Sequence, residues 1–284
     1  MTQERKTIIV TGGNSGIGFE TAKVLTQHGH RVVITGRDEA KLRQAASTIQ
    51  AVTHGDIFYR LGDFASFDSV RTLAKALLAE PRLDVLINNA GVARSQRTMT
   101  QDGNEMVLQV NHLSPFLLTH LLLDKIKANA PARIVNVSSR SHRLARDLGF
   151  DDVQFARSFS ATRSYSRTKL YNILFTRELA RRLVGTGVTV NALHPGVIVS
   201  RLGLDGDLHG IMRVLMHLRQ PFKSSAKMGS KVACFVATAP EIEGVSGQYF
   251  STNLQVVQPT RLARDDEAAR RLWEISCQLV GLSA

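Results

Sequence analysis

Seven short, mostly apolar runs recur along the chain, and stretches long enough for helices separate them. The runs are TIIVT (7–11), RVVIT (31–35), IFYRL (57–61), DVLIN (84–88), RIVNV (133–137), VTVNAL (188–193) and GQYF (247–250). The amphipathic stretches include 16–28, 38–51, 66–79, 104–128 and 165–185. Strands rich in Val and Ile that alternate with helices form parallel sheets covered on both faces. The sequence therefore predicts an α/β fold: a single doubly wound, Rossmann-like domain with a parallel sheet of about seven strands and helices on both faces.

The N-terminus and the cysteines indicate the setting in which the chain folds. MTQERKTIIV enters an apolar run too short for a signal peptide or a membrane span, so we expect a cytoplasmic protein. Cys234 and Cys277 are too few for a disulfide framework, and neither lies in a spacing typical of metal ligands. No repeat or Pro/Ser-rich linker divides the chain, so we expect one dinucleotide-binding and catalytic domain over residues 1–284.

The formal net charge of +12 favours anionic partners such as nucleotides, acidic surfaces or anionic lipid headgroups. The basic residues are scattered in short clusters such as RSHRLAR (140–146), and no aromatic-studded basic stripe accompanies them. We therefore expect no nucleic-acid binding.

A glycine-rich turn, VTGGNSGIGFETAKVL, follows the first run and opens a helix. Gly12, Gly16 and Gly18 lie where the strand turns sharply into the helix, and side chains there would block a phosphate. Backbone N–H groups and the positive end of the helix dipole would then face a pyrophosphate. The spacing differs from G-x-G-x-x-G, and such a turn also occurs where nothing binds. The dinucleotide interpretation therefore needs support from the rest of the chain.

The second run ends in ITGRDEAKL, where many dinucleotide-binding folds carry the residue that recognises the ribose. A guanidinium can bind a 2′-phosphate with two hydrogen bonds, so Arg37 favours NADP(H) over NAD(H). The alternatives are a solvated loop charge for Arg37 and a helix N-cap for Asp38.

The segment SYSRTKLYN (164–172) places Tyr165 four residues before Lys169, so both side chains share one helix face. Exposed pairs at this spacing are common, so the pair alone does not define a site. A free phenol has a pKa of about 10, and we expect the Lys169 cation to lower the pKa of Tyr165. Tyr171 lies on another part of the helix and is expected to pack in the core.

Seven motifs in order resemble the short-chain dehydrogenase/reductase family. They are TGGNSGIG (11–18), GDF (62–64), NNAG (88–91), VN (110–111), VSS (137–139), YSRTK (165–169) and HPG (194–196). Within that family, RIVNVSSRSHRL and LYNILFTRELARRL are similar to the retinol dehydrogenase branch and its WW-domain oxidoreductase relatives. The resemblance implies hydride exchange between a nicotinamide and a carbonyl or alcohol carbon.

The resemblance also implies a catalytic set of four residues: Asn111, Ser139, Tyr165 and Lys169. Tyr165 would be the general acid in reduction and the base in oxidation, and Lys169 would also hydrogen-bond the nicotinamide ribose. Ser139 would bind the substrate oxygen, with Ser138 matching less closely. Asn111 would link Lys169 to solvent through a water, or would only kink its helix. The residues between the serines and Tyr165, 143–163, are expected to form an irregular insertion.

The implied cofactor contacts align the transferring hydride rather than react. They are Gly12, Asn14, Ser15, Gly16, Ile17, Gly18, Arg37, Asp63, Phe64, Asn89, Ala90, Gly91, Tyr165, Lys169, Pro195, Gly196, Val199 and Ser200.

Residues 201–228 combine apolar and basic side chains, and three interpretations stay open. They form a lid over a bulky apolar substrate, an amphipathic helix packed on the body, or a weak peripheral contact with an anionic membrane. The main hypothesis is an NADP(H)-dependent carbonyl reductase or alcohol dehydrogenase for an apolar, retinal-like aldehyde or ketone. The alternative is a catalytically weak NADP(H)-sensing interaction protein on the same fold. Surplus apolar surface on the helices around Asn111 and Tyr165 suggests a homodimer.

Overall fold

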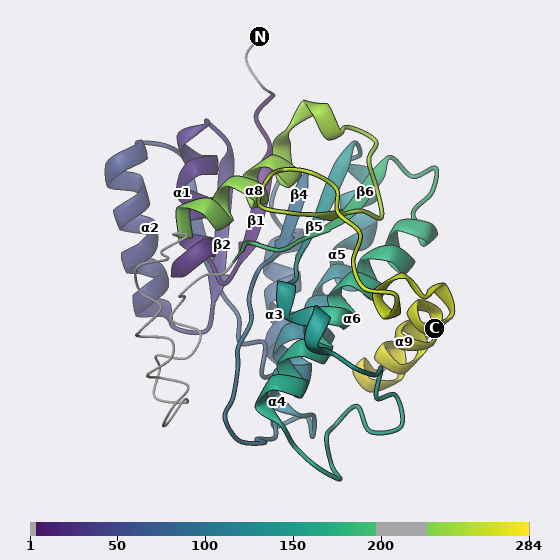
Figure 1. Ribbon diagram of the computed structural model, residues 1–284. Coiled ribbons are helices and arrows are strands. Elements are labelled where there is room, and N and C mark those ends of the chain that lie inside the picture. Colours follow the sequence, from purple (N-terminus) through teal and green to yellow (C-terminus); the bar gives the residue numbers. More distant parts are fainter. Residues whose placement is uncertain (1–3, 197–225, 284) are drawn as a thin grey trace.

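The computed structural model describes residues 4–196 and 226–283. Its centre is one parallel sheet (Figure 1). The strands are β1 (Thr7–Thr11), β2 (Arg31–Gly36), β3 (Ile57–Leu61), β4 (Val85–Asn88), β5 (Ala132–Val137), β6 (Val188–Leu193) and β7 (Tyr249–Phe250). Their order is β3-β2-β1-β4-β5-β6-β7, and all pair in parallel. The predicted seven-stranded, Rossmann-like fold is confirmed.

Helices cover both faces of the sheet (Figure 1). One face carries α1 (Gly16–Gln27), α2 (Glu39–Thr53) and α8 (Ala226–Thr238). The other carries α3 (Phe67–Leu78), α4 (Met106–Leu108), α5 (Ser114–Ala128), α6 (Ala161–Arg182) and α9 (Asp266–Val280). Successive side chains of a strand point to opposite faces of the sheet. Ile8 and Val10 therefore pack on the face that carries α1, and Ile9 packs on the face that carries α5. Both faces need apolar residues for this reason, and the strands read as continuous apolar runs.

Side-chain caps decide where several helices begin. Asp38 caps α2 by accepting a hydrogen bond from the Lys41 N–H at 3.1 Å, as the helix-cap interpretation of Asp38 expected. Ser160 caps α6 in the same way, accepting from the Arg163 N–H at 3.4 Å. Helix α6 therefore starts at Ala161, ahead of the predicted boundary at 165, and Tyr165 lies in its second turn.

The long helix predicted at 104–128 is not uniform. After α4, residues Gln109–Leu113 form a π-helical turn, η1, before α5 continues. One extra residue in a turn of this type shifts the side chains that follow it, and such turns recur at functional sites. Asn111 lies in the middle of this turn.

The C-terminal helix α9 packs on α6, on the face that carries Tyr171 and Phe175. The Trp273 ring lies 4.9 Å from the Phe116 ring, and the Arg182 guanidinium lies 4.2 Å from the Trp273 ring. The apolar surface that suggested a homodimer is thus covered in part by a helix of the same chain.

Candidate active site

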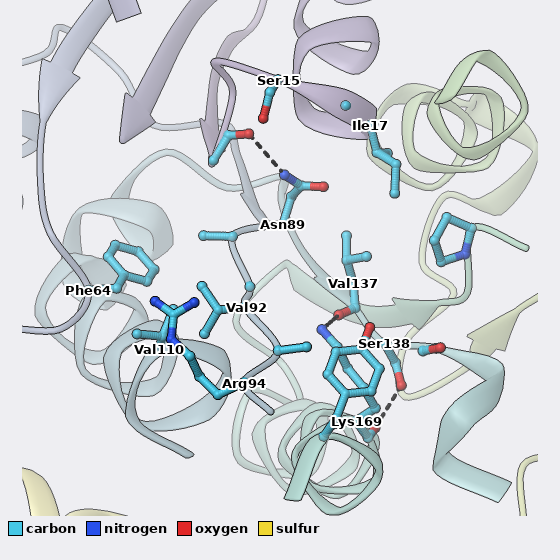
Figure 2. Close-up of a pocket in the computed structure, with 18 of the residues that line it drawn as sticks. Ser15, Ile17, Phe64, Asn89, Val92, Arg94, Val110, Val137, Ser138 and Lys169 are labelled. Carbon is cyan, nitrogen blue, oxygen red and sulfur yellow. Dashed lines mark hydrogen bonds between the residues drawn. The ribbon is translucent and has the colours of Figure 1, made fainter. Parts of the chain in front are cut away.

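A cavity of about 710 Å³ opens at the carboxyl ends of the strands, where the strand order reverses between β1 and β4. Open α/β sheets bind ligands at such a switch point. Figure 2 shows Ser15 and Asn89 at one end of this cavity, with Ser138 and Lys169 at another. Among the described residues, every predicted site residue lines the cavity except Gly18 and Asn111. Val199, Ser200 and residues 201–225 of the expected lid lie outside the described residues, and residues 226–228 begin α8.

The glycine turn between β1 and α1 disfavours side chains, at some positions by backbone conformation and at others by contact. Gly12 has φ +66° and Gly16 φ +57°, a region that glycine occupies without strain. A Cβ on Gly18 would lie 2.3 Å from the Gly12 carbonyl oxygen. The Ser15 side chain makes no capping hydrogen bond to α1. The first N–H groups of α1 therefore have no side-chain acceptor at this cap, and groups of this kind bind phosphates.

Thr11 connects the glycine turn to the end of β4, and the sequence analysis missed it. Its Oγ1 accepts hydrogen bonds from the N–H groups of Asn89 at 2.9 Å and Ala90 at 3.0 Å. The Asn89 side chain in turn donates to the Thr11 carbonyl at 2.8 Å. These bonds hold the NNAG segment against the turn, so the two walls of the cavity keep a fixed separation. A threonine that ends a strand just before a glycine turn was the available signal.

The charged residues after β2 are arranged by the start of α2. Arg37 is exposed and lines the cavity together with Lys41. The Asp38 carboxylate accepts from the Lys41 backbone and lies 3.3 Å from the Lys41 ammonium. These hydrogen bonds and the Lys41 charge, led by the backbone bond, keep the pKa of Asp38 below its usual value. Asp38 also lines the cavity, but its carboxylate is engaged with the start of its own helix, whereas Arg37 and Lys41 bring cations to the same wall. Sequence reasoning missed Lys41, although its place one turn after the cap was visible.

Tyr165 and Lys169 meet in the cavity as the helical spacing predicted. The Lys169 ammonium lies 5.5 Å from the centre of the Tyr165 ring. It also donates to the Val137 carbonyl at 3.1 Å (Figure 2). Lys169 is buried among the residues at the end of β5. The two side chains therefore face the same space as the glycine turn.

The protonation of this pair differs from the expectation. Burial raises the pKa of Tyr165 to about 12, and a hydrogen bond with Ser139 acts in the opposite direction. Burial also lowers the pKa of Lys169 to about 8. The lowered phenol pKa expected from the neighbouring ammonium is not found in this structure, because desolvation of the phenolate is the largest effect and only the Ser139 hydrogen bond opposes it. At neutral pH the phenol is protonated and the lysine is a cation.

The two serines after β5 have different surroundings. The Ser138 hydroxyl donates to the Lys169 carbonyl at 2.6 Å and is buried, so it ties β5 to α6 (Figure 2). The Ser139 hydroxyl lines the cavity and bonds Ser141 at 3.2 Å and Tyr165. Beyond Ser139 lie the short helix η2 (Arg140–Leu144) and a largely irregular segment up to Ser160.

His142 fixes the backbone of Ser139, and the sequence analysis did not single it out. The His142 ring is buried, and its Nδ1 lies 2.7 Å from the Ser139 carbonyl oxygen. Its Nε2 accepts from the Thr260 N–H at 3.4 Å, which assigns the Nδ1-protonated neutral form. Burial lowers the pKa of His142, consistent with that form.

Asn111 lies behind the cavity wall and bonds the backbone of Val92. Its amide oxygen accepts from the Val92 N–H at 2.7 Å, and its amide nitrogen donates to the Val92 carbonyl at 2.9 Å. The same nitrogen lies 3.2 Å from the Thr168 hydroxyl on α6. A Cβ on Gly91 would come within 3.3 Å of the Asn111 oxygen and 3.5 Å of the Lys169 ammonium. Asn111 therefore connects η1, the NNAG segment and α6 close to Lys169.

The other predicted cofactor residues complete the walls. Asp63 and Phe64 line the cavity after β3, with the Asp63 carboxylate accepting from the Ala65 N–H at 2.9 Å. Pro195 and Gly196 line it after β6, and Gly196 has φ +88°.

Comparison with known proteins defines the class of this fold and site. The family model described as short chain dehydrogenase matches residues 6–204. A crystal structure of an uncharacterised protein from Mycobacterium paratuberculosis has a TM-score of 0.79 at 30% identity, covering 98% of this chain and 94% of that one. The RhlG/NADP active-site complex of Pseudomonas aeruginosa has a TM-score of 0.68 at 26% identity, covering 88% and 96%. The chain belongs to the short-chain dehydrogenase/reductase family and is an oxidoreductase.

Within this class the chain is similar to retinol dehydrogenases. It is 42% identical to human retinol dehydrogenase 14 and 46% identical to mouse retinol dehydrogenase 11, over 98% of this chain and 87% of each relative. Identity to human retinol dehydrogenase 13 is 45%, over 98% of this chain and 86% of the relative.

The expectation of a cytoplasmic protein is wrong, because these retinol dehydrogenase relatives are membrane-associated. Among the described residues, the helix Met106–Ala128 is long and apolar enough to cross a bilayer by length and composition. Most of this helix is buried inside the protein, as in the core helix of a folded domain.

Proposed function

We propose that the protein is an NADP(H)-dependent oxidoreductase that exchanges a hydride between nicotinamide and a carbonyl or alcohol of an apolar, retinal-like substrate. The single observation that carries the proposal is the meeting of Tyr165 and Lys169, 5.5 Å apart, in the cavity that the glycine turn also lines. Membership of the short-chain dehydrogenase/reductase family supports the same chemistry.

The direction of proton transfer follows from the buried phenol. When bound, reduced nicotinamide supplies the hydride for the carbonyl carbon. Tyr165, protonated at neutral pH, donates its proton to the carbonyl oxygen as that oxygen gains negative charge. Ser139, which bonds Tyr165, donates to the same oxygen and orients it. In the reverse direction the phenolate has to form first, so reduction is the favoured direction near neutral pH.

Lys169 and Asn111 support Tyr165 and Ser139. The Lys169 ammonium stabilises the phenolate left after proton transfer and would bond the nicotinamide ribose when the cofactor is bound. Asn111 holds the Val92 backbone and α6 together, and in this proposal it also orders a water that returns a proton to the site through Lys169.

The residues present fit a dinucleotide. The glycine turn offers backbone N–H groups without a side-chain cap, and a Cβ at Gly18 would collide with that turn. We assign the 2′-phosphate of NADP(H) to Arg37, with Lys41 as a second cation. Asp38 is held by Lys41 and the start of α2, and this engagement supports phosphate recognition over a carboxylate bond to an unmodified ribose.

The substrate half of the cavity supports an apolar ligand. Val137, whose carbonyl accepts from Lys169, and Leu144, at the end of η2, line the cavity together with Tyr165. Val110 lines it nearer to Phe64 (Figure 2). Apolar side chains beside a few polar groups at the reacting centre suit an aldehyde or ketone with a hydrocarbon body. The retinol dehydrogenase relatives make retinal the first compound to test.

A screen of NADPH consumption tests the proposal. Retinal, medium-chain aldehydes, quinones and steroid ketones are each offered to the wild type and to Tyr165→Phe. We expect at least one apolar carbonyl to be reduced by the wild type alone. If none is reduced faster than by Tyr165→Phe, while NADPH still binds, the alternative of a catalytically weak NADP(H) sensor is supported instead.

A further inference from the structure

An arginine-rich surface lies beside the mouth of the cavity. The short helix η2 and the two residues after it spell RSHRLAR, residues 140–146, and bring Arg140, Arg143 and Arg146 to the surface. Arg163, at the start of α6, lies next to them, because a second cavity of about 650 Å³ is lined by Arg143, Arg146 and Arg163 together. We call these four arginines and Leu144 the basic rim. The mechanism proposed above uses none of the four arginines, and of this set only Leu144 belongs to the proposed substrate lining.

The basic rim adjoins the active site directly. Leu144 and Thr162 line both the second cavity and the active-site cavity, and Arg140 also lines the active-site cavity. A molecule that touches the rim is therefore at the entrance to the space that holds Tyr165.

The arginines of the rim carry positive charge that the described residues do not pair. Within residues 4–196 and 226–283, no carboxylate forms an ion pair with Arg140, Arg143 or Arg146. Two acids that follow the rim in the sequence pair with other arginines, although Asp147 also lines the second cavity. Asp147 pairs with Arg167, whose side chain is only 7% exposed, and Asp151 pairs with Arg157 at 3.0 Å.

An apolar side chain stands among these charges. Leu144 is 57% exposed, with Arg143 before it and Arg146 two residues after it. Exposing a leucine to water costs free energy that insertion into a hydrocarbon layer would recover. Arginines around it would at the same time bond lipid phosphates with two hydrogen bonds each.

We infer that the basic rim docks on a bilayer that contains anionic lipids, with Leu144 inserted at the headgroup boundary and the cavity mouth turned toward the lipid. Clustered cations with an apolar tip match such a surface in both charge and polarity. For the apolar substrate class proposed above, the consequence is delivery of substrate from the membrane into the cavity without passage through water. Docking itself does not depend on that substrate class.

Vesicle sedimentation with the full chain tests the inference. Vesicles of phosphatidylcholine alone are compared with vesicles that also contain phosphatidylserine. A basic residue near such a surface contributes about a fivefold gain in partitioning, so Arg143→Gln with Arg146→Gln should weaken binding to the anionic vesicles about 30-fold. Leu144→Ala should weaken binding to them severalfold and leave its salt dependence unchanged. All three side chains are exposed, so the variants should fold, and their thermal unfolding is checked.

The control removes two positive charges elsewhere: Lys75→Gln on α3 with Lys231→Gln on α8, both exposed. We expect this variant to retain most of the binding. Equal binding to neutral and anionic vesicles would overturn the inference, as would equal losses in the rim and control variants. Displacement of the vesicles by millimolar glycerol phosphate would indicate a site for small anions and would also overturn it. None of these measurements uses turnover, so the proposed reaction can fail while docking holds, and the reverse.

Discussion

Replacing Tyr165 by phenylalanine is the sharpest test of the catalytic arrangement. The substitution removes one oxygen and keeps the ring that lines the cavity, so the cofactor crevice should keep its shape. General acid catalysis contributes between about 100-fold and 10,000-fold, so kcat/KM for carbonyl reduction should fall by that factor, or about 3 to 5 kcal/mol. Binding of NADPH should change little.

The structure also limits what the substitution costs in stability. The Tyr165 hydroxyl bonds Ser139, which retains its bond to Ser141 in the variant. One lost hydrogen bond is worth about 1 kcal/mol, so the midpoint of thermal unfolding should drop by only about 2–4 °C. A loss of activity larger than 100-fold cannot then be explained by unfolding.

Tyr171 provides the matched control on the same helix. It is buried two residues further on, and its hydroxyl donates to the Leu148 carbonyl rather than facing the cavity. Tyr171→Phe should lower stability by a similar or larger amount and leave kcat/KM within about twofold. Reduction is followed by the absorbance of NADPH, and cofactor binding by its fluorescence. A Tyr165→Phe enzyme that keeps more than about a tenth of wild-type kcat/KM would refute the assignment of the general acid.

Three further outcomes follow from the site. Arg37→Ala should raise KM for NADPH by about tenfold or more and barely change KM for NADH; equal changes for both cofactors would mean that Arg37 contacts no phosphate. The pKa of Lys169 is about 8 and that of Tyr165 about 12. The value of kcat/KM for reduction should therefore be constant below about pH 8 and fall above it, because Lys169 loses its charge. A profile that stays flat to about pH 10 would contradict this expectation. Gly18→Ala puts a methyl group 2.3 Å from the Gly12 carbonyl oxygen. The substitution should lower the free energy of unfolding in urea by about 1–3 kcal/mol and weaken NADPH binding. An unchanged free energy of unfolding would show that the turn can relax.

The strands were predictable because each must be apolar on both sides. All seven were located to within two residues at either end, since the runs that form them stand out against polar turns. Helix ends were harder. Helix α6 begins early because Ser160 caps it, and a serine in an irregular segment gives little warning of that role. Helix α9 was missed, although Asp265 at its start and Gly281, with φ +71°, at its end were readable signals.

At the site, the sequence could predict which residues share the cavity but not how burial changes them. Helical spacing brought Tyr165 to Lys169, and motif order brought both to the glycine turn. The sign of the Tyr165 pKa shift depends on how much water the fold removes, and spacing carries no such information. The role of His142 could not be predicted from the sequence either, because its hydrogen-bond partner Thr260 is far from it along the chain.

The packing of α9 on α6 makes the far end of the chain a support for the reaction centre. A chain cut before Asp266 would keep every residue that lines the crevice, yet it would uncover Phe116 and Phe175, which Trp273 now covers. Such a truncated enzyme should lose its activity because it aggregates, and not because its active site is damaged. A nonsense or frameshift mutation late in the reading frame would therefore act as a null allele.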